Sequence, residues 1–347
     1  MRRSSNCTVG VAFFVLTTSL LTGCATFRGS KRVDVGPFSE NTVGMVGEMQ
    51  KLNRSVTWTH LKKYETLPSV LAARDAVGQV RVLMRGVAFY SSQVVSLYDS
   101  PLPEERKISE LARYMKEIIT PNLTASGSPE FQVTPGYMDT LLQDIRSRQT
   151  FLSALDAAQP LVRLTVTAGD MLFDRAENNV QRAGADINAG IEAEFGSLRR
   201  RIEELDALHV ASVHSYTLLL QFRGGDPAAL DSLRLGDAGI REYLPYGRTP
   251  AAKDLDAAER FVVERSTTIK SLRDQLEPEF LIYKENQAEL EAMRNQTDER
   301  ARLGRATLFL WARSHRNLAA GISVPPMIDV VGIMKSTVET GVKGVLP

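Results

Sequence analysis

The chain has 347 residues, of which 42 are lysine or arginine and 41 are aspartate or glutamate, so its formal net charge is only +1. A balanced charge gives no electrostatic basis for binding nucleic acid, and we expect no nucleic-acid partner. Even without its first 23 residues the chain would have 324, which is enough for a large core or for two domains. Outside the N-terminal segment no apolar run reaches about 18 residues, so the sequence predicts no membrane-spanning helix there.

Residues 1–23 have the three parts of a secretory signal peptide. Arg2 and Arg3 form the positive end, residues 9–22 carry no charge, and Gly23 is the small residue expected at a cleavage site. The uncharged stretch is too short to cross about 30 Å of hydrocarbon as a finished helix. The pattern therefore predicts an exported protein whose first 23 residues are removed.

The tetrad Leu21-Thr22-Gly23-Cys24 resembles the lipobox of bacterial lipoprotein precursors. The resemblance implies cleavage after Gly23 and attachment of a diacylglyceryl group to the Cys24 thiol. Ala25 stands where aspartate would signal retention in the inner membrane, which implies sorting to the outer membrane. Cys7 is then removed and Cys24 is acylated, so no disulfide or reactive thiol remains. The alternative is an ordinary signal peptide, or an uncleaved anchor, with a chance cysteine.

After the cleavage site, residues 24–37 are predicted to form a tether and residues 38–347 an elongated all-α domain. Apolar residues recur every three or four positions, the period of an amphipathic helix. The first predicted helices span residues 39–64, 68–98 and 103–119. A loop rich in proline, serine and threonine follows over 120–135, and a fourth helix runs from residue 136 to Pro160, which should kink or break it.

Two long arms follow, over residues 161–222 and 251–321, and each carries an apolar stripe that keeps its phase. The first arm would be about 93 Å long at 1.5 Å per residue. Pro278 is predicted to bend the second arm, and a final amphipathic helix is expected after Pro325-Pro326. The fold class is therefore all-α: an elongated helical bundle built on a long antiparallel, coiled-coil-like hairpin, with the earlier helices packed along part of it.

The search for catalytic and metal-binding motifs finds none. Glycine-rich phosphate loops, the zinc-protease His-Glu-x-x-His motif and the Gly-x-Ser-x-Gly nucleophile motif do not occur. Asp206-x-x-His209 is the only approximation to a helical di-metal motif, and a surface ion pair explains it better. His209 and His214 point about 140° apart on a helix and cannot share a metal from one face. We expect no enzyme activity, no catalytic residue, no metal and no cofactor.

Two local patterns in the first arm have more than one interpretation. Residues 199–201 are three arginines, which form either a docking patch or a solvated helix face with ion pairs to nearby glutamates. Four glycines lie inside the arm, and they indicate either close contact between helices or a segment that bends. These glycines are Gly169, Gly184, Gly190 and Gly196.

The turn between the arms, residues 224–250, is the most distinctive segment. It combines tyrosine, arginine and aliphatic residues, the types enriched at binding hot spots. Because a hairpin end offers little core, we expect some of these apolar side chains to be exposed as an interaction patch. The alternative is a self-packed cap. The candidate interaction residues are Ile240, Arg241, Tyr243, Leu244, Tyr246 and Arg248.

These features favour a non-enzymatic cell-envelope lipoprotein with an interaction, scaffolding or spacer role. We expect it to be held at the outer membrane by its N-terminal lipid, facing the periplasm or exposed at the surface. Its partner would be an unidentified envelope protein or a second copy of the chain. The alternative is a membrane-active helical protein, because long hairpins with an apolar tip resemble the α-helical pore-forming toxins in architecture.

Overall fold

The computed structural model describes residues 33–52, 59–125 and 134–324, and all regular structure within these ranges is helical. The all-α prediction is therefore confirmed. The predicted signal peptide, Cys24, most of the predicted tether and the last expected helix lie outside the described residues. The helices are α1 (Gly36–Leu52), α2 (Pro68–Asp99), α3 (Glu104–Ala125), α4 (Pro135–Arg146), α5 (Phe151–Ala157), α6 (Gln159–Arg223), α7 (Pro227–Gly236) and α8 (Ala252–Ala319), with short 3-10 turns η1 (Leu61–Tyr64) and η3 (Gly239–Glu242).

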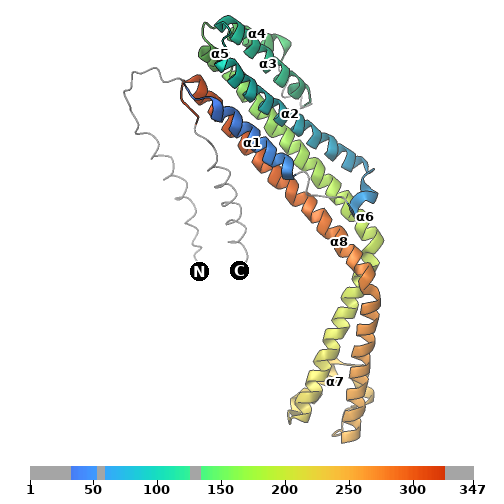
Figure 1. Ribbon diagram of the computed structural model, residues 1–347. Helices are drawn as coiled ribbons and strands as arrows, with labels where there is room; N and C mark the ends of the chain where they lie inside the picture. Colours follow the sequence, from blue (N-terminus) through green and yellow to red (C-terminus); the bar gives the residue numbers. More distant parts are fainter. Residues whose placement is uncertain (1–32, 53–58, 126–133, 325–347) are drawn as a thin grey trace, which may run out of the picture.

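Helices α6 and α8 form the long antiparallel hairpin that the two apolar stripes predict (Figure 1). They contain 65 and 68 residues, which corresponds to roughly 100 Å each at 1.5 Å per residue. The predicted arms agree with these two helices to within about two residues. None of the described helices combines the length and apolar character needed to cross a membrane.

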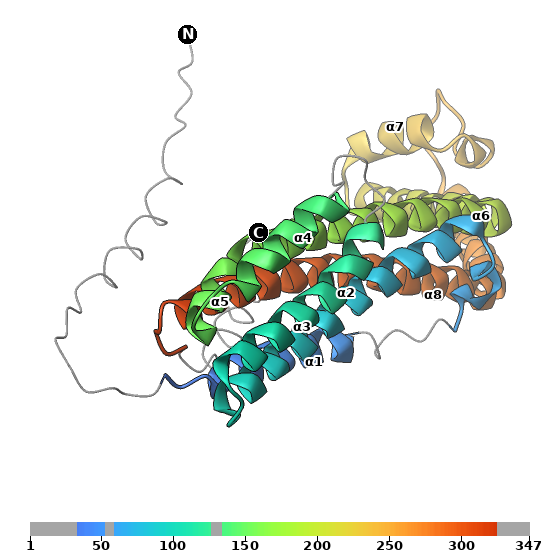
Figure 2. The ribbon, with the colours of Figure 1, turned by 90° about the horizontal axis from the view of Figure 1, so that it is seen from above.

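The other helices cover only one half of this hairpin. Helices α1 and α2 pack along α6 and α8, and α3, α4 and α5 gather at the end of the bundle (Figures 1 and 2). The largest core cluster lies in this half and includes Tyr90, Leu161, Phe173 and Trp311. Among the residues that the structure describes, the other half consists of α6 and α8 alone until α7 is reached. The molecule is therefore a thick bundle that continues as a thin two-helix arm.

The prediction of one continuous fourth helix from residue 136 to Pro160 is wrong in one respect, because the helix is interrupted between α4 and α5. Thr150 and Ser153 form a capping box in which each side chain accepts the other residue's backbone N–H at 3.2 Å. Glu104 of α3 also accepts the N–H of Phe151 at 2.6 Å, so α5 begins against a neighbouring helix. These caps stabilise a new helix start that the apolar period alone does not reveal. The predicted break at Pro160 is present, since α6 begins at Gln159 with this proline in its first turn.

Glycines allow the long helices to approach closely, which agrees with the first interpretation of the arm glycines. A Cβ atom built on Gly169 would lie 2.2 Å from Leu308 of α8, and one on Gly190 would lie 2.6 Å from the Tyr64 ring. Gly184 similarly faces Arg294, whereas the nearest neighbour of Gly196 belongs to its own helix. The tightest position, Gly304, was not singled out from the sequence: a Cβ there would meet Phe173 at 1.9 Å. Small residues on both arms therefore permit the tight packing.

The rod bends just beyond the lower end of the bundle (Figure 1). There, Glu289 of α8 accepts the backbone N–H groups of Thr59, His60 and Leu61 at 2.6, 2.7 and 2.9 Å, which fixes η1 to the hairpin. Pro278 lies inside α8 about three turns farther along. Proline removes a helix hydrogen bond and crowds the preceding turn, and it is a common cause of helix kinks. We attribute the bend to Pro278, as the sequence predicts.

His315 is fully buried near the end of the bundle, where α8 ends and α6 begins. Its Nε2 atom lies 2.8 Å from the Tyr90 hydroxyl, and its Nδ1 atom lies 2.9 Å from the side-chain nitrogen of Gln159. Beside it, the Trp311 indole N–H donates to the Ser91 hydroxyl at 3.0 Å. Burial lowers the pKa of His315 to about 3. The neutral ring therefore joins α2, α6 and α8 through paired polar atoms.

This burial predicts acid sensitivity. Because the folded-state pKa of His315 lies below the value in the unfolded chain, the unfolded state binds the extra proton as the pH falls. The free energy of unfolding should then decrease by about 1.4 kcal/mol per pH unit between about pH 6 and pH 4 through this residue. His315→Gln should reduce that slope in denaturant titrations. His214→Gln, which changes an exposed histidine, should leave it unchanged, and equal slopes for all three proteins would contradict the assignment.

Candidate functional site

The far end of the hairpin is closed by a small folded cap. Helix α6 ends at Arg223, and Gly225 takes a positive φ of 101° that other residues rarely adopt. Asp226 then caps α7 by accepting the N–H of Ala228 at 3.0 Å, with Pro227 in the first turn. The sequence Gly-Gly-Asp-Pro thus ends one helix and immediately starts another that turns back against α6.

The cap has its own hydrophobic core, so the expectation that the hairpin end offers little core is wrong. Helix α7 and η3 lie against one side of α6 and α8 and supply a third layer. Ile240 and Leu244 consequently have no exposed surface. Tyr243 is half-buried, with its ring 5.0 Å from that of Phe261. The buried members of this core are Leu219, Leu230, Leu233, Ile240, Leu244, Ala258 and Val262.

Arg234 of α7 holds the loop that follows. It is 5% exposed, and its guanidinium donates to the carbonyl oxygens of Leu244, Pro245 and Arg248 at 2.9, 2.7 and 3.0 Å. Arg241 in turn donates to the carbonyl of Arg234 at 2.6 Å. The sequence analysis did not single out Arg234. Its position one turn after Leu230, on an apolar helix face, is the signal that could have identified a buried arginine.

A second polar network joins the cap to both arms. Asp237 is 8% exposed and accepts hydrogen bonds from Arg265 of α8, from the Ser215 hydroxyl of α6 at 2.8 Å and from the N–H of Gly239 at 3.1 Å. Arg265 also donates to Ser212 at 3.0 Å. Burial alone would raise the pKa of Asp237, but the hydrogen bonds from Arg265 and Ser215 outweigh it, and the pKa lies below its usual value.

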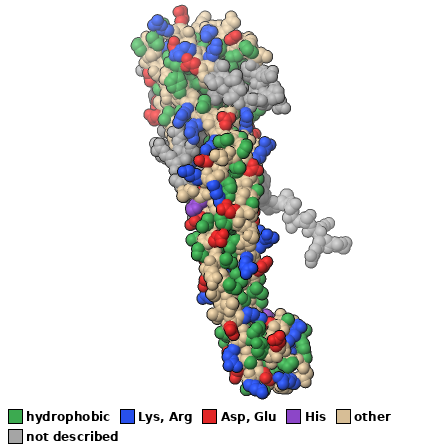
Figure 3. All heavy atoms as spheres, turned by 90° about the vertical axis from the view of Figure 1, so that its right-hand side faces the viewer, with side chains coloured by type: hydrophobic (Ala, Val, Ile, Leu, Met, Phe, Trp, Pro, Cys, Tyr) green, Lys and Arg blue, Asp and Glu red, His purple; other side chains and the backbone are tan. Residues whose placement is uncertain are grey.

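The six candidate tip residues therefore divide into two groups. The cap core contains Ile240, Leu244 and much of Tyr243. This agrees with the alternative that the turn forms a self-packed cap. Tyr246, Arg241 and Arg248 remain exposed, and they are joined by Leu235, which is 71% exposed. Figure 3 shows the rod narrowing below the bundle and widening again at this capped end.

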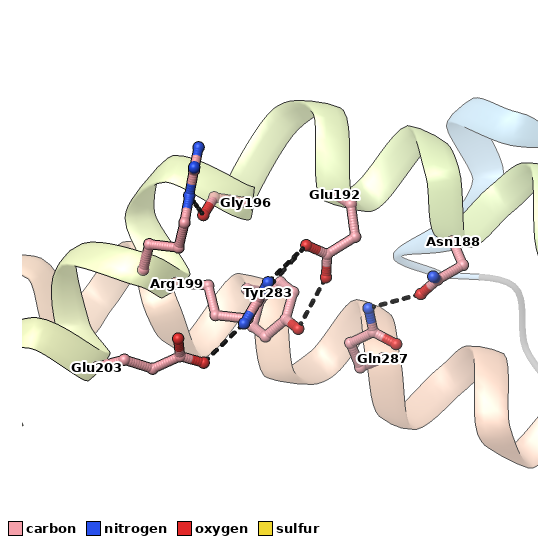
Figure 4. Close-up of polar contacts among 8 residues, drawn as sticks. Asn188, Glu192, Gly196, Arg199, Glu203, Tyr283 and Gln287 are labelled. Atoms are coloured by element: carbon pink, nitrogen blue, oxygen red, sulfur yellow. Dashed lines mark hydrogen bonds and ion pairs between the residues drawn. The ribbon is translucent and has the colours of Figure 1, made fainter.

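Within the arginine run in the middle of the rod, Arg199 forms ion pairs. Arg199 contacts Glu203 at 2.7 Å and Glu192 at 3.3 Å, and Glu192 also accepts the Tyr283 hydroxyl of α8 at 3.1 Å (Figure 4). Arg200 donates to the carbonyl of Gly196 at 3.3 Å. Exposed pairs of this kind stabilise a protein by less than about 1 kcal/mol each. The run is thus a solvated helix face with a local role in holding α6 against α8.

The metal-binding candidates are not assembled into a site. Asp206 pairs with Arg273 at 2.8 Å, and His209 lies 3.3 Å from the Ser266 hydroxyl. His60, which directly precedes η1, lies 3.5 Å from Glu285 of α8 and is far from His209 along the rod. Within the ranges that the structure describes, no three His, Cys, Asp or Glu side chains are grouped to hold a metal ion.

We predict that Asp237→Asn loosens the cap. Removing one partner of a mostly buried ion pair leaves Arg265 without its counter-charge, which should destabilise the cap by about 2–3 kcal/mol at neutral pH. Because the folded pKa is lowered, the carboxylate contributes stability above the usual aspartate pKa and loses it in acid. Faster hydrogen exchange in α7 would report the change. Asp231→Asn, an exposed aspartate on the same helix, should have little effect, and equal exchange in the two variants would contradict the prediction.

Comparisons with known proteins give no relative on which to base a function: no family model, no curated protein and no solved structure matches this chain.

Proposed function

We propose that this chain is a membrane-anchored lipoprotein of the cell envelope that acts as a non-enzymatic spacer and presents its capped end for interaction. The proposal joins the lipobox at Cys24 to the arrangement of the rod. The observation that supports it most is that both ends of the described chain lie at the end of the rod opposite the cap.

Both ends of the described chain meet at the bundle end of the rod. The N–H of Asp34 donates to the Ser323 hydroxyl at 3.2 Å, and Val35 and Val324 are both buried there. The cap of α7 and η3 is at the opposite end (Figure 1). Val33 is the ninth residue after Cys24, and an extended chain of that length spans at most about 32 Å. A lipid on Cys24 would therefore hold the bundle near the membrane and leave the thin arm to project away.

The dimensions suit a spacer. A hairpin of roughly 100 Å places its cap far beyond the reach of a compact domain of similar size, for which the radius of gyration would be about 20 Å. The exposed residues at the cap, Leu235 and Tyr246 beside Arg241 and Arg248, would then be the part offered to a partner. No second candidate function has a comparable observation in its favour.

The anchor is tested by mass. Cys24 is the only cysteine after position 7, so Cys24→Ala should abolish acylation and block cleavage after Gly23. Intact-mass measurement of the membrane fraction should find acyl chains on the wild-type protein and an unprocessed, unacylated mutant. An unacylated wild-type protein, or normal processing of the mutant, would overturn the lipoprotein proposal.

The orientation of the rod is tested by energy transfer from labelled positions to the membrane. Leu235→Cys places a donor dye at the cap, and Ile322→Cys places one at the bundle end; both side chains are exposed. The acylated protein is inserted into vesicles that contain an acceptor lipid. We expect strong transfer from position 322 and almost none from position 235. Equal transfer from both positions would mean that the rod lies flat on the membrane and is not a spacer.

A further inference from the structure

The bundle has a groove along the stretch between the end of α1 and the start of η1. Helices α2 and α8 both pack against α6, and α1 lies between α2 and α8 as far as Leu52. Nearer the bend, η1 is fixed to α8 (Figure 1). Between these two points α6 forms the floor of the groove, and α2 and α8 form its walls.

The groove contains a hollow of about 340 Å³, which we call the bundle hollow. Its apolar lining comes from three helices, and most of these side chains are buried. Gly78 of α2 also lines it, and a Cβ atom built on Gly78 would meet nothing within 4 Å, so the space beside this part of α2 is open. The apolar side chains are Val70, Ala73, Val77, Val180, Ala183 and Met293.

Two arginines stand at the end of the bundle hollow that is nearer α1. Arg81 of α2 and Arg300 of α8 both line the hollow, and both also line a smaller cavity of about 70 Å³ that continues toward Val46 of α1. Arg300 donates to the neutral side chain of Gln296 at 3.2 Å. Among the described residues, Arg81 has no ion-pair or hydrogen-bond partner, and the charge that acts on it is that of Arg300.

The charge at this end of the hollow is positive. Burial and the charge of Arg81 lower the pKa of Arg300, and they outweigh the opposite effect of Glu299. Two guanidinium groups that repel each other are stabilised by an anion between them, and the guanidinium fork fits a carboxylate. The other charged groups that line the two spaces are already paired, Arg74 with Glu65 at 3.3 Å and Glu177 with Arg305 at 2.6 Å.

We propose that the bundle hollow binds a fatty acid, with the carboxylate between Arg81 and Arg300 and the chain along the apolar floor toward Val70. From Arg81 to Val70 the hollow follows α2 for about 16 Å. That length matches one acyl chain, because the chains of two leaflets together fill about 30 Å of hydrocarbon. The volume is at the lower end of the ~300–1,000 Å³ of ligand sites, which suits one chain and not two. Binding of this ligand depends on neither the lipid anchor nor the spacer role.

Photo-crosslinking tests the ligand. The full chain, purified from the membrane fraction in a neutral detergent, is irradiated with palmitic acid that carries a diazirine near the end of its chain, and labelled peptides are identified by mass. We expect labels near Val70, Ala183 and Met293. The matched fatty alcohol should label at least fivefold less, because it offers no charge to the arginines. Equal labelling by the acid and the alcohol, or labels outside the hollow, would overturn the proposal.

Variants with matched controls test the site. Arg81→Gln should lower labelling about fivefold, whereas Arg85→Gln, an exposed arginine one turn along α2 that lines neither space, should not. Gly78→Leu should fill the hollow and block labelling, and leucine favours a helix more than glycine does. Gly44→Leu, at another helical glycine with open space around it, should label normally. Melting temperatures of all four exclude unfolding as the cause. Labelling that does not differ between Arg81→Gln and Arg85→Gln would overturn the proposal.

Two other occupants of the hollow would give different results. If lysophosphatidic acid displaces the probe at a tenfold lower concentration than palmitic acid does, the ligand is a phosphate lipid and the fatty-acid proposal is wrong. Residues 53–58 connect α1 to η1 and lie outside the described residues. If labelling appears only after Val56→Ala and Trp58→Ala are introduced together, this connection fills the hollow in the native chain, which also overturns the proposal.

Discussion

The apolar seam between α6 and α8 is the interaction on which the rest of the structure depends. Most of the stability of a helix in a protein comes from packing of its apolar face, so the long apolar stripes of α6 and α8 must each be buried by a neighbour. The antiparallel partner buries only part of each stripe. In the bundle half the remainder is covered by α1 and α2, and near the end it is covered by α7 and η3. Because the shorter helices are distributed unevenly along the hairpin, the molecule has a thick half, a thin half and a cap.

Polar contacts fix the register of this seam. Apolar side chains at three-four spacing would pack almost equally well after a shift of one heptad along the rod. Three ion pairs between the long helices at separate levels oppose such a shift: Arg305 with Glu177, Arg273 with Asp206 and Arg223 with Asp256. The buried His315 network and the Glu289 clasp on η1 add specific partners at two further levels. Shifting the register of α8 against α6 would separate His315 from Gln159 and leave buried polar atoms without partners, at a cost of about 1–3 kcal/mol for each such group.

Much of the fold could be predicted from the sequence because it follows from local periodicity. The unbroken stripe from Leu164 to Leu220 and the Gly-Gly-Asp-Pro turn determine a hairpin without reference to distant residues. The interruption at Thr150 depends on a capping box and on Glu104, forty-six residues earlier, and neither leaves a mark on the apolar period. The burial of Ile240 and Leu244 depends on α7 folding back, a tertiary event that the spacing of Leu230 and Leu233 only suggests.

The bend at Pro278 has a mechanical consequence for a rod held at one end. A straight rod that spins about its own axis leaves its far end above the same point. When a bent rod makes the same rotation, its far end travels around a circle. The radius of that circle depends on the length of the arm beyond the bend and on how sharply the rod bends. From Ala252 to Pro278 that arm is about 40 Å long. If the rod is anchored at its bundle end as proposed, rotation about the bundle axis is thus enough to carry the cap sideways, with no change in the fold.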